Sequence, residues 1–494
     1  YTEMPVLRVT WLDNMAGHQS SHGNLAEAAQ CKLYIAYLIA LHLQDTLSRH
    51  DRGGVPKNAA AFSYTAPNLQ NEAINPKLTF QEGMYDSPVF TKTGLIRTLN
   101  MAIEYLKQAQ MYEAAIDVYQ SLVAMFRAED NFVQLQRAYA SLSSICESLV
   151  KLQQTGRFFP CYYRVAFYGK KFGAFDKKEF IYKQDWKVKV VDIAERLRNQ
   201  FGRKYGDANV EILPNKPIDF KSLDKSKCYL QLATVAPYDC PKLPVNINKF
   251  MLQVPFTKQK DGEGKAHGGV ATQFIRRTIF TTEGYFPWIN NRQFIAEKEV
   301  VELTPIENAI ELIKGQCRDM NLVISTSPLD RQALQRMLQG SVNPQVHGGT
   351  LEVADAFLGD KAPKDLDAKQ VSSLCKALAE FLKQCRTGVE LNKSSAADIG
   401  PQTPAPVGGG QTGLDSPARP ENHAISSLIR NNNSTSSTSS ASAAELKQAA
   451  QEAKFQLQIE SAFNKLVKKM RELLPSKMSL PATFEFDEDA PEMD

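Results

Sequence analysis

The spacing of apolar residues along this 494-residue chain changes twice, and each change marks a different kind of structure. Up to about residue 205, apolar residues recur every three or four positions, which is typical of helices. Runs that approach the alternation of strands occur between 206 and 303, and helical spacing returns from 304 to about 475. We therefore predict an α+β fold that is mainly α. It would have three lobes: an N-terminal helical array, a central antiparallel β lobe and a C-terminal helical bundle.

The N-terminal region, residues 1–205, contains helical stretches separated by a long loop. Residues 7–47 and 94–150 carry apolar side chains at helical spacing, whereas residues 51–93 are rich in Gly, Pro and Asn. Such a composition favours turns over regular structure. We therefore predict a helical lobe, 1–205, that is interrupted by a loop over 51–93.

The middle region, residues 206–303, contains short runs rich in β-branched and aromatic residues. These runs cover 228–235, 250–256 and 278–282. Their composition and near-alternation favour strands. The glycine-rich segment 262–269 lacks the Gly-Lys-Ser/Thr sequence of a phosphate-binding loop, so we interpret it as a hairpin or loop.

The C-terminal region begins with a signal for the start of a helix. Thr304 precedes Pro305, and Glu307 lies three positions after the threonine, which is the pattern of a capping box with a proline at the first helical position. From there the apolar spacing predicts helices near 305–325, 329–339, 351–358 and 365–393.

The end of the chain changes character twice more. Residues 394–443 are rich in Gly, Pro and Ser and contain too few apolar residues to form a core, so we predict a disordered insert. A last helix is expected over 444–474, with Leu457, Phe463 and Met470 on its apolar side. An acidic tail, 476–494, closes the sequence.

Composition and motifs exclude several classes of function. The formal net charge of +4 is small for this length, so nucleic acid is not an expected partner. The 7 histidines and 8 cysteines contain no C-x-x-C pair and no H-E-x-x-H motif, so neither a metal site nor a disulfide framework is expected. No G-x-S-x-G motif for a nucleophilic serine is present. The longest apolar run, 33–43, is about half the length that crosses a bilayer, so we expect no transmembrane segment.

One helical pattern is interrupted between residues 339 and 351. Gly340, Pro344 and the pair Gly348–Gly349 fall in this stretch, and a helix cannot continue cheaply through such residues. We therefore predict a loop over 340–350 between two helices. Val342 and Val346 are branched aliphatic residues in that loop, where an apolar side chain has no evident reason to be exposed.

The residues around this break resemble the signature of the dedicator-of-cytokinesis (DOCK) family. The matching residues are 339–342, 346–349, 351–354 and 357–358. Further stretches agree in the family's order: 7–12, 26–31, 163–169, 179–183, 276–279 and 303–310. The chain resembles the second Dock homology region of this family, in its zizimin or zizimin-related branch.

The resemblance implies a guanine-nucleotide exchange factor for a Rac-like or Cdc-like Rho-family GTPase, acting in cytoskeletal signalling. In that family the valine just before the glycine pair is a nucleotide sensor that expels Mg²⁺, and Val346 is the matching residue. Gln345, His347, Gly348 and Gly349 would form the rest of the GTPase-binding loop.

The resemblance also bears on chemistry and partners. Nucleotide exchange makes and breaks no covalent bond. The resemblance therefore implies that the chain is not a chemical enzyme and has no cofactor of its own. The factor would act on the Mg²⁺ and GDP that the partner GTPase holds. The helical lobe would pair two copies of the chain into a homodimer.

The residues alone leave alternatives open. Val346 could be a loop valine folded back onto its own bundle, and the chain could be a non-catalytic helical scaffold that binds small GTPases or other partners. His347 could contact the GTPase or make exchange sensitive to pH. Because the chain begins with Tyr1, we expect a piece of a longer cytoplasmic protein, with any membrane recruitment left to regions outside it.

Deletion of residues 400–440 is expected to leave nucleotide exchange within about twofold of the intact chain, because a segment this poor in apolar residues contributes little to a core. Release of fluorescent GDP from a Rho-family GTPase measures this directly. Loss of folding on the deletion would show that the segment is structural.

Overall fold

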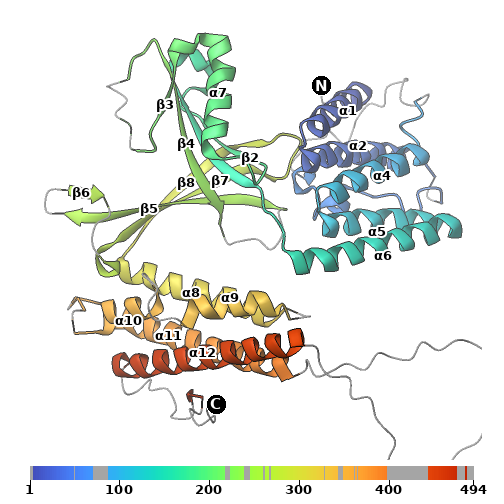
Figure 1. Cartoon of the computed structure of the whole chain (residues 1–494). Helices are drawn as coiled ribbons and strands as arrows, with labels where there is room; N and C mark the ends of the chain where they lie inside the picture. The colour runs from blue at the N-terminus through green and yellow to red at the C-terminus, as the bar shows by residue number, and fades with distance from the viewer. Residues whose placement is uncertain are drawn as a thin grey trace, which may run out of the picture. The chain divides into compact units, whose positions relative to one another are not determined.

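The structure is a computed structural model, and its contacts divide the chain into two compact units. The first unit comprises residues 1–255 and 275–302, and the second comprises residues 256–274 and 303–494. The structure describes residues 4–48, 50–70, 87–216, 218, 223–238, 245–259, 262–265, 269–326, 329–342, 349–360, 362–363, 365–397, 443–474 and 484–486. Most helices and strands of both units are labelled in Figure 1.

The first unit begins with the helical array that the apolar spacing predicts. Its elements are α1 (Pro5–Ser21), α2 (Leu25–Thr46), η1 (Ala59–Phe62), η2 (Pro67–Gln70), α4 (Lys92–Gln108), α5 (Tyr112–Ala128) and α6 (Phe132–Thr155). The expected loop over 51–93 contains the two short 3₁₀ helices, and its residues 71–86 lie outside the described residues. Turns at Gln110 (φ 57°) and Asp130 (φ 51°) are short, so α4, α5 and α6 follow one another as antiparallel neighbours.

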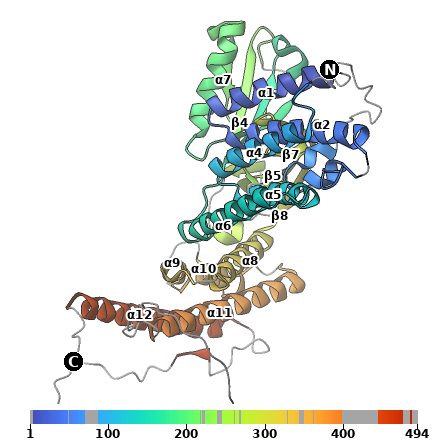
Figure 2. The same cartoon turned by 90° about the vertical axis from the view of Figure 1, so that its right-hand side faces the viewer.

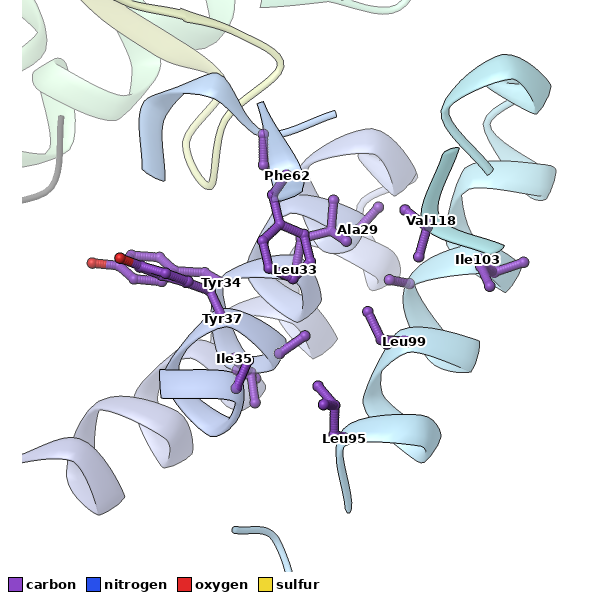
Figure 3. Packing of buried hydrophobic residues seen from close by; sticks show 14 of the residues in the cluster. Ala29, Leu33, Tyr34, Ile35, Tyr37, Phe62, Leu95, Leu99, Ile103 and Val118 are labelled. Carbon is purple, nitrogen blue, oxygen red and sulfur yellow. The ribbon is translucent and has the colours of Figure 1, made fainter. Parts of the chain in front are cut away.

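Helix α2 forms the centre of this array. Every residue from Ala26 to Ala40 is buried, as expected for a helix with no solvent-facing side. Figure 3 shows Leu33 of α2 in the same apolar cluster as Leu99 of α4 and Val118 of α5. Burial of such side chains is the main favourable contribution to folding.

Polar groups of the helical array bind the β sheet of the same unit. Glu27 of α2 is buried, and its carboxylate accepts a hydrogen bond of 2.6 Å from the Lys183 ammonium on β2. The Gln19 side chain donates to the carbonyl of Ile289 at 2.8 Å. Removal of either charge of the Glu27–Lys183 pair would leave the other in a mostly buried site, so the pair specifies where α2 meets the sheet.

The sheet contains eight described strands in the order β3-β4-β1-β2-β8-β7-β5-β6, with a further pairing of β4 with β5. Their bounds are β1 (Cys161–Tyr168), β2 (Glu179–Gln184), β3 (Val210–Leu213), β4 (Cys228–Pro237), β5 (Ile247–Gln259), β6 (Gly262–Lys265), β7 (Phe274–Phe286) and β8 (Arg292–Leu303). The first unit also contains η3 (Lys170–Phe175), α7 (Val190–Tyr205) and η4 (Asp207–Asn209), whereas η5 (Val270–Thr272) belongs to the second unit. Strands β5 and β6 form the hairpin predicted around 262–269.

Two features of the sheet differ from the prediction. The sheet was expected to begin at 206, but β1 and β2 come from residues 161–184, inside the predicted helical lobe. Seven of the eight β1 residues are buried, so this strand lacks the alternation that identifies a half-exposed strand. In addition, β3 runs parallel to β4, whereas the other registered pairings are antiparallel as predicted.

The second unit is a helical bundle. Its helices are α8 (Pro305–Ile324), α9 (Arg331–Val342), α10 (Thr350–Leu358), α11 (Ala368–Ala397) and α12 (Ala443–Leu473). The predicted capping box is present: the Thr304 amide donates to the Glu307 carboxylate at 2.9 Å, and the Glu307 amide donates to Thr304 Oγ1 at 3.4 Å. Helix α11 continues to Ala397, beyond the predicted start of the insert at 394, and residues 398–442 lie outside the described part of the chain.

Helix α12 packs into this bundle beside α11, and Figure 2 gives a second view of the two helices. Phe463 and Met470 are fully buried, as predicted. Leu457 is 53% exposed, so its placement on the apolar side was wrong. Six positions separate Leu457 from Phe463, which is not a helical repeat, so the two side chains face different directions. Within the described residues, no helix combines the length and the apolar character needed to span a bilayer.

Replacement Phe463→Ala is expected to lower the free energy of unfolding of the bundle by about 3–5 kcal/mol, because it leaves a cavity among α11, α12 and the segment near Phe484. Native-state hydrogen exchange of amides in α8, α11 and α12 measures the effect. The control Leu457→Ala removes an exposed side chain of the same helix and should change protection by less than about 0.5 kcal/mol. Equal effects of the two variants would contradict the burial of Phe463.

Candidate functional site

The helix before the predicted loop ends one turn later than expected. Leu334, Leu338 and Val342 are 0%, 0% and 1% exposed and recur every four residues along α9. Gly340 therefore lies within the helix, and the expectation that Val342 belongs to an exposed loop was wrong. Burial of Val342 in the bundle offsets the cost of about 1 kcal/mol of one helical glycine.

The helix after the loop begins at a buried threonine. Thr350 is 5% exposed, and its hydroxyl donates to the Gln316 side-chain oxygen of α8 at 3.2 Å. Gly349 precedes the helix in an extended conformation (φ −70°, ψ 169°), and its carbonyl accepts the Val353 amide at 3.1 Å. Any residue can adopt this backbone conformation, so the backbone angles do not require glycine at 349. A glycine there can only let another group approach the backbone closely or let the chain change conformation.

Close packing within the bundle holds the two helices on either side of the loop, α9 and α10. A Cβ placed on Gly388 of α11 would lie 3.1 Å from Leu338 Cδ2, so glycine lets α11 approach α9 closely. The turn η5, whose Val270 and Ala271 pack against the bundle, contacts α8 and α10. Sequence reasoning identified neither feature, and a small residue within the apolar stripe of α11 was the available signal for Gly388.

The predicted site residues fall between these two helix ends. Gln345, Val346, His347 and Gly348 lie outside the described residues, and Gly349 is the residue directly before α10. The described structure therefore defines the two anchors of the loop. Val342 belongs to the apolar cluster of the bundle and Thr350 is also buried, so the chain is held on either side of the loop.

The buried cysteine thiols of the bundle are not activated for chemistry. Burial raises the pKa of the Cys317 thiol to about 11, and burial also raises the pKa of the Cys375 and Cys385 thiols. These thiols are therefore neutral near pH 7 and pack as small apolar groups. Among the residues that the structure describes, no group of three or more His, Cys, Asp or Glu side chains is arranged to hold a metal ion.

Comparisons with known proteins identify the class of module. Three family models match in chain order: DHR-2 Lobe A at residues 1–151, DHR-2 Lobe B at 215–285 and DHR-2 Lobe C at 319–399. Together these matches cover more than half of the chain and include α9, Gly349 and α10.

Similar curated proteins agree with the family models. Human dedicator of cytokinesis protein 7 is 35% identical over 412 residues, and mouse dedicator of cytokinesis protein 6 is 35% identical over 422 residues. Human dedicator of cytokinesis protein 8 is 32% identical over 407 residues. These alignments cover 80%, 81% and 80% of this chain but only 19%, 20% and 19% of the relatives, so the chain spans about a fifth of their length.

The fold and the matches define a DHR-2 module, with helices at both ends of the chain and a β sheet between them. The chain belongs to the dedicator-of-cytokinesis family, as the residues around the helix break indicated.

Proposed function

We propose that this chain is a guanine-nucleotide exchange factor for a Rac-like or Cdc-like Rho-family GTPase. The observation that carries the proposal is the pair of buried helix ends, Val342 and Thr350, on either side of the segment that contains Val346. Membership of the DHR-2 family supports it, because DHR-2 domains of DOCK proteins are Rho GTPase exchange modules. The proposed mechanism needs no covalent step and no cofactor of its own.

The proposed role of Val346 follows from the coordination chemistry of magnesium. A GTPase holds its nucleotide through Mg²⁺, which bridges phosphate oxygens and protein side chains. The ion requires nearly octahedral oxygen coordination and keeps several waters. Valine methyl groups placed at its site offer no ligand and exclude those waters. Mg²⁺ then dissociates, and the phosphates lose the cation that balances their charge.

Thermodynamic linkage sets the size of the effect. If the exchange factor weakens nucleotide binding, the nucleotide weakens binding of the factor by the same ratio. A thousandfold loss of nucleotide affinity corresponds to about 4 kcal/mol of coupling. Tight binding of the nucleotide-free GTPase would supply this free energy, and incoming GTP with Mg²⁺ would then displace Val346.

The rest of the proposed loop supports the approach of the valine. Gln345, His347 and Gly348 would contact the GTPase, and Gly349 would allow close approach at the point where the chain returns to α10. Gly349 has an ordinary extended backbone, so its backbone angles do not require glycine. Its proposed advantage is the absence of a side chain, which would let the loop approach the GTPase closely.

We further propose the lobe organisation and setting of the module. Residues 1–160 would form the helical lobe, the β lobe would begin with β1 at Cys161, and 304–475 would form the sensor-bearing bundle. The chain would act in the cytoplasm, where thiols stay reduced, and regions outside it would supply any membrane recruitment.

Replacement Val346→Ala is expected to slow GDP release at least about tenfold, or about 1.4 kcal/mol in the barrier, while GTPase binding is kept. Fluorescent-GDP release measured over a panel of Rho-family GTPases tests it, and the same panel distinguishes an exchange factor from a scaffold. A scaffold would leave every release rate unchanged.

Val342→Ala is the matched comparison for stability, because it removes the same methyl groups from a buried anchor four residues earlier. It should lower bundle stability by about 1–3 kcal/mol. Val346→Ala should leave stability unchanged. GDP release at the original rate with Val346→Ala would overturn the sensor assignment.

We also propose that the helical lobe pairs two copies of the chain. Phe132, Tyr139, Cys146 and Val150 are exposed on α6, at intervals of seven, seven and four residues. These intervals place the four side chains on one face of the helix. An exposed apolar stripe of this kind is typical of an interaction surface, and a symmetric dimer would cover it with its own copy.

The double variant Phe132→Asp/Val150→Asp is expected to be monomeric at micromolar concentrations, where the unaltered chain is dimeric, because charges would be buried without partners. Sedimentation equilibrium measures the mass. Val191→Asp, which alters an exposed residue of α7, is the control and should stay dimeric. A monomeric unaltered chain would contradict the proposal.

A further inference from the structure

A three-residue segment near the C-terminus, Phe484–Phe486, lies against the outside of the bundle (Figure 1, red, beside α12). The rings of Phe484 and Phe486 contact the ring of Phe463, with centroids 6.1 and 5.6 Å apart. Phe463 is fully buried, whereas the three segment residues stay partly exposed. The segment therefore lies on the surface of the bundle and covers one of its core residues.

The backbone of the segment is held by a single buried amide. The Asn464 side chain donates from Nδ2 to the Phe486 carbonyl at 2.8 Å, and its Oδ1 accepts the Phe486 amide at 2.9 Å. Asn464 is 5% exposed with the segment in place, and loss of the segment would remove both of these hydrogen-bond partners. A side-chain amide that pairs with both backbone groups of one residue is a recognition contact for a peptide.

Two arginines complete the contact. The Arg386 guanidinium lies 5.2 Å from the centroid of the Phe484 ring and 5.9 Å from that of Phe486, within the range of cation–π attraction. Arg471 pairs with the Glu485 carboxylate. The sequence that follows, from 487 to 489, is Asp-Glu-Asp, so the peptide is acidic and the surface presents arginines.

We propose that Arg386, Phe463, Asn464 and Arg471 form a peptide-docking surface, which this chain occupies with its own Phe484–Phe486. The partner it fits is a peptide of another protein in which two aromatic residues flank an acidic residue and further acids follow. Each part of this chemistry has a matching group: Phe463 and the Arg386 guanidinium for the rings, Asn464 for the backbone and Arg471 for the acid between them. The surface is formed by α11 and α12, and the proposal does not rest on the exchange role.

Tethering explains how the surface stays occupied. Nine residues, 475–483, join Leu474 at the end of α12 to Phe484, and a short tether gives a local concentration on the order of millimolar. A free peptide with the same contacts must compete with that concentration. Exchange of one peptide for the other is possible because the contact involves three partly exposed residues.

The test uses a fluorescent synthetic peptide of residues 480–494 and the full chain, with fluorescence anisotropy as the readout. The variant Phe484→Ala/Phe486→Ala removes both rings from the resident segment and so largely empties the surface, and it should bind the peptide at least tenfold tighter than the unaltered chain does. Adding Asn464→Ala to that variant should weaken binding at least tenfold. A peptide with both phenylalanines replaced by alanine is the control and should not bind.

Two results would overturn the proposal. One is failure of the emptied variant to bind the peptide, and the other is equally tight binding by the unaltered chain. If binding by the unaltered chain rises on dilution, the resident segment comes from a second copy, which contradicts occupation within one chain.

A second measurement needs no substitution. Excess unlabelled peptide, up to about 5 mM and therefore above the local concentration of the tethered segment, should speed hydrogen exchange at the Phe486 amide, because displacement frees it from Asn464. Exchange in α8 should stay unchanged. No change at Phe486 would show that the segment is a fixed part of the bundle and would overturn the docking role.

Discussion

The candidate site depends on one constraint of backbone geometry: a helix cannot continue into Asn343-Pro344. Proline lacks an amide hydrogen and restricts the residue before it to extended conformations, so α9 must end at Val342. The end is fixed in place because Leu334, Leu338 and Val342 are buried against the rest of the bundle. The described chain therefore ends one helix at a buried residue and resumes before Thr350, which is also buried.

The helical regions could be predicted closely from the sequence, whereas the extent of the sheet could not. Helix α8 carries both an amphipathic pattern and a capping box, and these independent signals agree. Strand β1 is buried on both faces and therefore shows no alternation, and β8 carries several charged residues that obscure it. These two strands were therefore missed, whereas β4, which is also largely buried, was found from its β-branched and aromatic residues.

The candidate site shows the same limit on a smaller scale. Gly340 suggested that the helix ends, but Val342 continues the four-residue repeat of Leu334 and Leu338, and packing outweighed the intrinsic cost of glycine. The family resemblance supplied the role of Val346, which periodicity alone left open. The close approach of α11 at Gly388 had a local signal, a small residue within an apolar stripe. The contacts of Asn464 depend on Phe486, which is distant in sequence, so no local pattern could predict them.

The two buried anchors also limit how an exchange loop could work. A side chain that displaces Mg²⁺ is pushed back by the GTPase. The backbone on either side of that side chain must therefore stay in place until the ion dissociates. A thousandfold effect on nucleotide affinity requires about 4 kcal/mol of coupling. Burial of one branched aliphatic side chain contributes about 1.5–3 kcal/mol, so a single anchor would be marginal. Val342 on one side, and Thr350 with its hydrogen bond to Gln316 on the other, divide the load between two buried helix ends. A wedge of the proposed kind would therefore be better supported by two buried helix ends than by one.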